Sequence, residues 1–242
     1  MSESAGGLMV EEASWVDVKA RLQAGATALL PVGAACKEHG AHLPMATDRI
    51  QADWLGRGLA RHADVVVWPT LSYGYYPAFV RYPGSISLAR ETFVRLAQDV
   101  LRGIMLSGAC QVLVVNTGIS TIGPLQDAIR SLRTQGRLTL VNTYAGPSFR
   151  RVVQELEEQR CGSHADEIET SIMLVIAPER VRMDQAVAWD ANRLQGVFNP
   201  DDPTSFGYSP SGVCGDPTRA NAAKGRRLLA AMFSDVLNQL SG

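Results

Sequence analysis

The stretch "LLPVGAACKEHGAHLPMATD", residues 29–48, joins an apolar run to a polar loop that is rich in reactive side chains. The run at 26–34, "ATALLPVGA", is apolar almost throughout, which is typical of a strand covered on both faces of a parallel sheet. The loop carries six ionisable side chains: Cys36, Lys37, Glu38, His39, His42 and Asp48. The stretch therefore predicts a buried strand followed by a loop that could carry chemistry.

Strand-like and helix-like segments alternate along the chain. Further buried strands are predicted at 64–71, 111–117 and 137–144. Helices are predicted at 48–62, 88–108, 123–136, 163–178 and 218–240. The order predicts an α/β fold, a three-layer α/β/α sandwich with a mainly parallel sheet. No repeat or linker interrupts it, so we expect a single domain over residues 1–242, with a long Pro-, Gly- and Asp-rich loop at 196–217 that is functional.

Composition excludes several classes of function. The net charge of -1 argues against nucleic acid or an anionic membrane as a partner. No apolar run approaches the length of a membrane span, and the N-terminus does not resemble a signal peptide. The four cysteines (Cys36, Cys110, Cys161 and Cys214) are widely spaced, which argues against a zinc ribbon or a disulfide framework. We therefore expect a cytoplasmic protein.

Polar, glycine-containing loops follow all four predicted strands, at 33–48, 72–85, 116–121 and 142–148. Ligands bind beyond the carboxyl ends of the strands in open α/β sheets, so these loops predict one shared pocket. The second loop is rich in aromatic residues: Tyr73, Tyr75, Tyr76, Phe79 and Tyr82. These rings could line a small-molecule pocket, or they could pack within the loop or at an oligomer interface.

The first loop offers a candidate metal pair. His39 and Asp48 are suitable ligands for zinc, manganese or iron, but a spacing of nine residues does not distinguish a ligand pair from other roles. His39 could instead bond its own loop backbone, and Asp48 could cap a helix. Glu38 could be a ligand, a general base or a solvated charge. Lys37 could be exposed, or it could neutralise a group of carboxylates.

A second polar group lies at 162–171, "GSHADEIETS". If this segment is helical, His164, Glu167 and Ser171 lie near one face. Acidic residues also stabilise a helix N-terminus, which accounts for one or two of the three carboxylates. Nucleophilic catalysis has less support: there is no GxSxG motif, Ser120 has no neighbouring base, and Cys36 beside His39 is weak evidence.

Together these motifs resemble the creatininase (creatinine amidohydrolase) family. Residues 29–48 are similar to its signature, approximately LPxGSxEQHGPHLPxxTD. The resemblance continues in the same order through four segments: "YGYYPAFVRYPGSIS", "VLVVN", "HADEIETSIML" and "SPSGVCGDPTRANAAKGRRLL". It implies a three-layer α/β fold, assembly into trimers or hexamers, and hydrolysis of C–N bonds in small or cyclic amides. One or two divalent ions (zinc, manganese or iron) are implied as cofactors.

Carried over by position, the resemblance is partial. His39 and Asp48 match ligands of the family, and His164 and Glu169 match the histidine and glutamate of its HAxxxETS segment. Three positions differ: Lys37 stands where the family has a ligand glutamate, Gly118 where it has a ligand histidine, and Phe79 where a histidine is common. The first loop is one residue longer, so a bulge could let Glu38 replace the glutamate. The resemblance thus implies a divergent member of the family that lacks some of the usual metal ligands.

The resemblance and the residues together predict the site. Candidate metal ligands are His39, Asp48, Glu169 and Glu38; candidate catalytic groups are His164, Glu167, Lys37 and Glu38; candidate substrate contacts are His42, Tyr73, Tyr76, Phe79, Asn116, Thr117 and Ser120. Since the missing ligands belong to one ion of a pair, we expect a single ion or none. It would activate water for attack on a small amide.

Two alternatives remain open at this stage. The chain could be a hydrolysis-deficient family member that binds a small metabolite, or a metal-free enzyme that uses Lys37, Glu38 and His164 as acid–base groups. We expect a homo-oligomer in either case, by resemblance to the family.

Overall fold

The computed structural model describes residues 6–134, 136–189 and 209–240. Of the long loop predicted at 196–217, residues 196–208 lie outside the described part of the chain. No helix among the described residues is long and apolar enough to cross a membrane.

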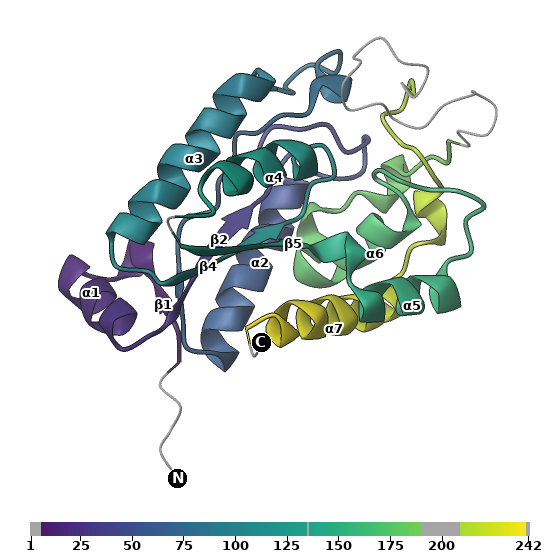
Figure 1. The fold of residues 1–242 in the computed structure, drawn as a ribbon. Coiled ribbons are helices and arrows are strands. Elements are labelled where there is room, and N and C mark those ends of the chain that lie inside the picture. Colours follow the sequence, from purple (N-terminus) through teal and green to yellow (C-terminus); the bar gives the residue numbers. More distant parts are fainter. Residues whose placement is uncertain (1–5, 135, 190–208, 241–242) are drawn as a thin grey trace.

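A five-stranded sheet forms the centre of the molecule (Figure 1). Its strands are β1 (Leu8–Met9), β2 (Thr27–Val32), β3 (Val65–Val67), β4 (Gln111–Asn116) and β5 (Arg137–Asn142). They lie in the order β1-β3-β2-β4-β5, and every pairing is parallel. The prediction of a mainly parallel sheet is confirmed. β1 was not predicted, because two residues are too short for a periodic pattern.

Seven α-helices are described: α1 (Trp15–Gln23), α2 (Thr47–His62), α3 (Arg90–Leu106), α4 (Ile122–Ser131), α5 (Pro147–Leu156), α6 (Glu167–Ile176) and α7 (Ala222–Asn238). α1 was not predicted; it begins at a capping box in which Ser14 and Asp17 bond each other's backbone N–H groups. The helix predicted at 123–136 corresponds to α4, which ends five residues earlier, at Ser131. The exposed residues 133 and 134 offer no apolar face to bury, so they do not extend the helix.

α6 is shorter than predicted at its N-terminus. Asp166 is the N-cap, and its carboxylate accepts the N–H groups of Ile168 and Glu169 at 3.0 Å each. Ala165 has a φ of 48°, outside helical geometry. His164 therefore precedes the helix, and the prediction that it shares a helix face with Glu167 was wrong.

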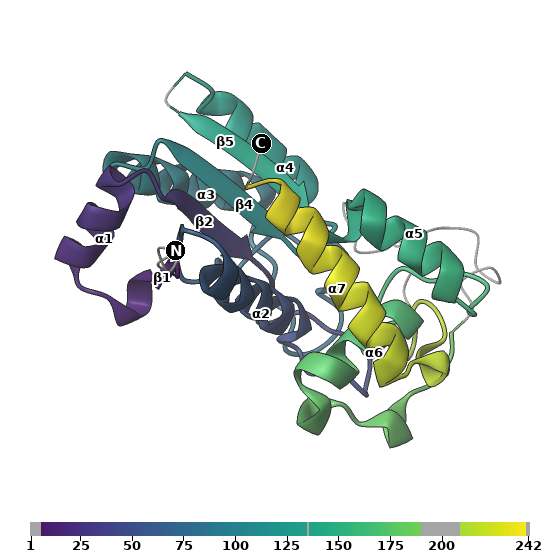
Figure 2. The ribbon, with the colours of Figure 1, turned by 90° about the horizontal axis from the view of Figure 1, so that it is seen from below.

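Helices cover both faces of the sheet (Figures 1 and 2). Successive side chains of a strand point to opposite faces, so Leu29 packs with residues of α2, α5, α6 and α7. Leu30 packs with residues of α1, α3 and α4 on the other face. Each such fully buried leucine contributes roughly 1.5–3 kcal/mol through the hydrophobic effect. These two cores make the predicted three-layer sandwich.

The strand order places a crevice between β2 and β4. The chain moves from β2 to β3 on one side and then returns across β2 to β4. The helices that follow these neighbouring strands, α2 and α4, pack on opposite faces of the sheet. In open α/β sheets, ligands bind where the connections diverge in this way. We therefore expect a ligand site at the carboxyl ends of β2 and β4.

The N-terminus of α5 is held by Asp235 of α7. This buried carboxylate accepts the N–H of Ser148 at 3.1 Å and the N–H of Phe149 at 2.8 Å. We expect Asp235→Ala to lower the free energy of unfolding by about 1–2 kcal/mol, because both helix donors lose their partner. Urea unfolding measures the loss. Asp99→Ala removes an exposed carboxylate paired with Arg102 on α3 and should change stability by about 0.5 kcal/mol or less; equal losses would contradict the prediction.

Candidate functional site

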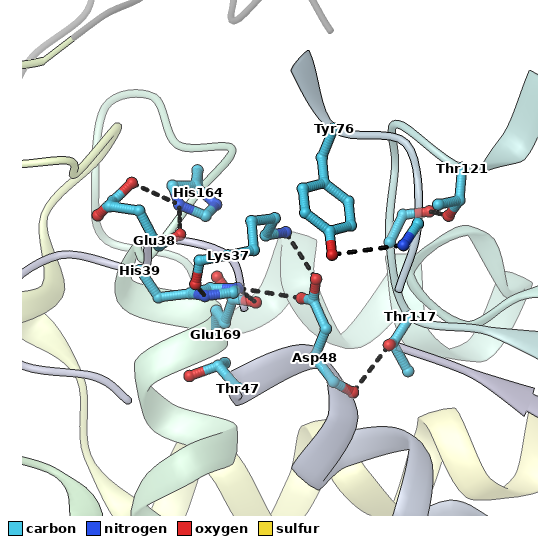
Figure 3. A network of polar contacts seen from close by, with 12 residues as sticks. Lys37, Glu38, His39, Thr47, Asp48, Tyr76, Thr117, Thr121, His164 and Glu169 are labelled. Carbon is cyan, nitrogen blue, oxygen red and sulfur yellow. Dashed lines mark hydrogen bonds and ion pairs between the residues drawn. The ribbon is translucent and has the colours of Figure 1, made fainter. Parts of the chain in front are cut away.

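The candidate site lies at the carboxyl ends of β2 and β4 (Figure 3). Asp48 comes from the first turn of α2, and Thr117 follows β4. The Thr117 hydroxyl contacts the carbonyl oxygen of Val32, at 3.1 Å, and that of Asp48, at 2.9 Å. This contact ties the ends of two strands to the start of α2. The loop after β2 and the segment before α6 supply the other groups.

His39 is fully buried between two carboxylates. Its Nδ1 donates to the carbonyl oxygen of Lys37 at 2.8 Å, which leaves Nε2 facing Asp48 Oδ1 at 3.1 Å and Glu169 Oε1 at 3.7 Å. Burial lowers the pKa of His39, and so does Lys37, but the attraction of Asp48 and Glu169 outweighs both and the pKa lies above its usual value. His39 Nε2 thus lies within reach of one oxygen of each carboxylate, where a proton or a cation could be shared.

Lys37 occupies the other oxygen of Asp48. Its Nζ lies 2.7 Å from Oδ2, and both side chains are at least nine-tenths buried. The ammonium also lies 5.0 Å from the centroid of the Phe79 ring, in cation–π geometry. Burial alone would raise the pKa of Asp48, but Lys37 and His39 lower it below its usual range. Asp48 is therefore ionised.

Glu38 is directed at His164. The ring Nε2 of His164 donates to the carbonyl oxygen of Glu38 at 2.7 Å and lies 3.3 Å from its carboxylate Oε2. Glu38 also accepts the N–H of Gly40. The centroid of the His164 ring lies 4.7 Å from that of the His39 ring and 4.5 Å from that of the Phe79 ring. The structure thus places the Glu38 carboxylate on His164 and not beside Asp48, where a replacement for the missing ligand glutamate would be needed.

The structure does not bring Glu167 into this group. Its carboxylate forms an ion pair with Lys224 of α7 and accepts the N–H groups of Glu158, at 2.9 Å, and Gln159, at 2.7 Å. It is fully buried. Glu167 therefore holds the segment that leads to His164, and we assign it no part in the chemistry below.

A cavity of about 420 Å³ opens beside the group. Lys37, Asp48, His164 and Glu169 line it, with three predicted substrate contacts: Phe79, Thr117 and Ser120. The other predicted contacts lie elsewhere. Tyr76 lines a smaller adjoining pocket, and Asn116 bonds Thr121 at the end of β4. The burial that encloses Tyr76 raises the pKa of its hydroxyl above the usual value.

His42 and Tyr73 are also outside this cavity. His42 Nε2 bonds the Thr170 hydroxyl at 2.9 Å, and burial lowers the pKa of its ring to about 4. Tyr73 is half exposed. Neither residue is among those that line the large cavity.

A protein-family model described as "Creatininase: Creatinine amidohydrolase" matches residues 11–240. The chain belongs to the creatininase family. A curated relative, the mycofactocin precursor peptide peptidase of Mycobacterium ulcerans (strain Agy99), is 31% identical over 231 residues, covering 88% of this chain and 84% of that protein. The creatinine amidohydrolase of Pseudomonas putida is 27% identical over 254 residues, covering 96% of each. The predicted family is thus confirmed.

Solved creatininase structures share the fold. A tryptophan-to-alanine variant of creatininase has a TM-score of 0.85 over 97% of both chains at 24% identity. A structure named "Creatininase Mn" has a TM-score of 0.76 over 97% of both chains at 25% identity. The α/β prediction is therefore confirmed, and the protein is a hydrolase of the creatininase family.

The family resemblance led us to expect metal ligands at positions 37 and 118. Both positions face the same oxygen, Asp48 Oδ2. Lys37 Nζ takes Asp48 Oδ2, and a Cβ at position 118 would lie 3.9 Å from that oxygen. Lys37 carries a positive charge and Gly118 has no side chain, so neither supplies a ligand. The surroundings of Asp48 Oδ2 therefore do not fit a metal ion.

The Oδ1 side of Asp48 fits one ion. Ligand atoms bound to a single tetrahedral ion at about 2.0–2.1 Å are about 3.3 Å apart, close to the distances from His39 Nε2 to Asp48 and Glu169. Among the described residues, His39, His164 and Glu169 form a group whose candidate ligand atoms all lie within 4.8 Å of one another; Asp48 adjoins this group through its contact with His39. An imidazole and carboxylate set suits zinc, manganese or iron.

Sequence reasoning missed one wall of the cavity. α5 contributes Phe149, Arg150, Val153, Gln154 and Glu157 near or within its bounds. The signal was available in part: the segment follows the fourth predicted strand, so its start was expected at the ligand-binding edge. Which face of α5 turns toward the cavity depends on how the helix packs, and no local pattern shows that.

Proposed function

We propose that this protein hydrolyses an amide C–N bond with one divalent ion held by His39, Asp48 and Glu169. The observation that carries the proposal is that His39 Nε2 lies 3.1 Å from Asp48 Oδ1 and 3.7 Å from Glu169 Oε1 beside the cavity, while Lys37 neutralises the other oxygen of Asp48. A bound ion at this point lowers the pKa of a water molecule and polarises the substrate carbonyl.

The side chains around the ion divide the remaining work. Lys37 lines the cavity, where its ammonium can donate to the negative charge that develops on the carbonyl oxygen. His164 moves a proton to the leaving nitrogen as water adds to the carbonyl carbon and the C–N bond breaks. Glu38 keeps the His164 ring in place through its carbonyl oxygen and its carboxylate. These three side chains supply charge, proton transfer and orientation.

The substrate proposal is an amide, and both a small amide and a peptide are consistent with it. One relative is named for creatinine and another for a peptide precursor. A cavity of about 420 Å³ falls within the range that holds drug-sized ligands, which is larger than a small cyclic amide requires. Both names support hydrolysis of a C–N bond.

We also propose a homo-oligomer, which light scattering would test.

A substrate panel tests the reaction itself. Lactams, formamides, N-acyl amino acids and dipeptides would be incubated with metal-depleted protein and with added zinc, manganese or iron. We expect turnover of at least one amide class, dependent on one of these ions. Turnover that is unchanged by metal depletion would contradict the metal mechanism, and the absence of turnover with every ion would contradict hydrolysis of these amides.

We expect no more than one tightly bound divalent ion per chain. Elemental analysis of protein purified without chelators measures the number. The variant Lys37→Glu with Gly118→His places a carboxylate and an imidazole toward Asp48 Oδ2, so its capacity should rise toward two ions. Two tight ions in the unmodified protein would contradict the prediction, because Lys37 Nζ occupies that oxygen.

The Lys37–Asp48 pair also favours the metal-free alternative, since the ammonium already supplies a positive charge beside Asp48. In that case Lys37, Glu38 and His164 act as the acid–base groups. Hydrolysis that continues in the presence of a strong chelator, and that is lost in Lys37→Met, would favour this mechanism over the metal mechanism. Binding of a panel amide without turnover would favour a hydrolysis-deficient protein.

A further inference from the structure

We propose that Arg150 selects substrates by binding a carboxylate, so that the preferred substrate is a linear amide that carries an anionic group and an apolar chain. The proposal rests on the proposed function, because it places that group in the cavity that adjoins the reacting side chains. Arg150 and the candidate ligand Glu169 line the same cavity of about 420 Å³.

The cavity extends along α5. The residues that line it from this part of the chain are Phe149, Arg150, Val153, Gln154 and Glu157. From Arg150 to Glu157 this spacing follows one face of a helix for two turns, or about 10 Å. A cavity of this length suits an extended ligand better than a single small ring. The ligand can therefore reach from the reacting groups to a side chain of α5.

Among the described charged residues that line the cavity, Arg150 differs from the others because its side chain has no described hydrogen bond or ion pair. Lys37 and Asp48 pair with each other. The remaining carboxylates also have partners: Glu157 and Asp166 each accept from the side-chain amide of Gln159, and Glu169 accepts the N–H of Ala165 at 2.8 Å. The cavity thus presents one guanidinium whose charge no described group balances.

Guanidinium geometry indicates what would bind there. Arginine presents parallel N–H donors that match the two oxygens of a carboxylate. Apolar side chains, including Phe149, Val153 and Ile168, line the same cavity and favour an aliphatic chain over a polar one. The matching ligand has a carboxylate for Arg150, an apolar stretch, and an amide that reaches Asp48 and Glu169.

A pair of probes that contain no hydrolysable bond tests the binding part. Hexanoate and hexan-1-ol have the same chain length and differ in charge, and each would be titrated by calorimetry into the metal-depleted full chain. We expect hexanoate to bind about tenfold more tightly than hexan-1-ol. Arg150→Gln should abolish this preference. Arg151→Gln is the matched control, because Arg151 is the next residue of α5, is exposed, and is not among the cavity-lining residues; it should keep the preference.

The outcomes separate this proposal from the proposed function. Equal binding of both probes, or a preference that survives in Arg150→Gln, overturns the role of Arg150 whether or not the protein is active. For turnover, N-acetylated amino acids would be compared with their C-terminal amides. A carboxylate preference of about tenfold in kcat/KM that Arg150→Gln removes supports the proposal, and its persistence in that variant overturns it. No turnover of either series, with the probe preference intact, counts against the hydrolase alone.

Discussion

His39→Ala is expected to lower kcat/KM by about a thousandfold or more for the amide that the unmodified protein hydrolyses fastest. Loss of the ring removes the nitrogen that faces both Asp48 Oδ1 and Glu169 Oε1, so the proposed ion would lose a ligand and its water would lose the activation. Divalent metal content should fall with the activity. Steady-state kinetics and elemental analysis of the same preparations measure the two effects.

His62→Ala is the matched control for this substitution. His62 is a histidine of α2 whose Nδ1 bonds the carbonyl oxygen of Gly58 at 2.9 Å, and it contacts Phe233 away from the site. Its removal should leave both kcat/KM and metal content within about twofold of the unmodified protein. If His39→Ala folds, retains its metal and keeps its turnover, His39 is not a ligand of the catalytic ion.

Lys224→Met is expected to lower the free energy of unfolding by about 3–5 kcal/mol. Lys224 forms an ion pair with Glu167, and both side chains are nine-tenths or more buried. Without the ammonium, Glu167 keeps two backbone donors but remains a charge buried without a counterion. The melting temperature should fall by roughly 10 °C for a chain of this size.

Arg227→Met provides the control, because Arg227 lies on the same helix, α7, and forms an ion pair with Glu155 in which both side chains are about half exposed. An exposed pair contributes about 0–1 kcal/mol, so this variant should remain close to the unmodified protein. Equal losses in the two variants would contradict the assignment of Glu167 as a buried structural anchor. A second variant, Lys224→Met with Glu167→Gln, should recover part of the stability, since no unpaired charge remains.

Much of the fold follows from local pattern. The apolar runs around Leu29, Val66 and Leu113 predict the central strands, because a strand covered on both faces exposes no side to water. α1 and β1 were missed because they are short and their burial comes from tertiary contacts. The start of α6 was misplaced because the capping role of Asp166 depends on the backbone geometry at Ala165.

The candidate site divides in a similar way. Sequence motifs brought His39, Asp48, His164 and Glu169 forward as a set, and the structure places them together. It also separates residues that the sequence grouped: Glu167 is two residues before Glu169, yet its carboxylate faces Lys224 of α7. Two residues span about half a turn of a helix, so the two side chains point to nearly opposite faces.

The sequence by itself determined the family, the parallel sheet and the edge of the sheet that carries the reactive loops, because these depend on periodicity and on motifs within short segments. Only the tertiary structure decided that Lys37 neutralises Asp48, that Glu38 orients His164, and that Arg150 shares their cavity. Each of these facts is a distance or a direction of side chains in space. Such distances are set by how helices and loops pack on the sheet, and the order of residues along the chain does not contain them.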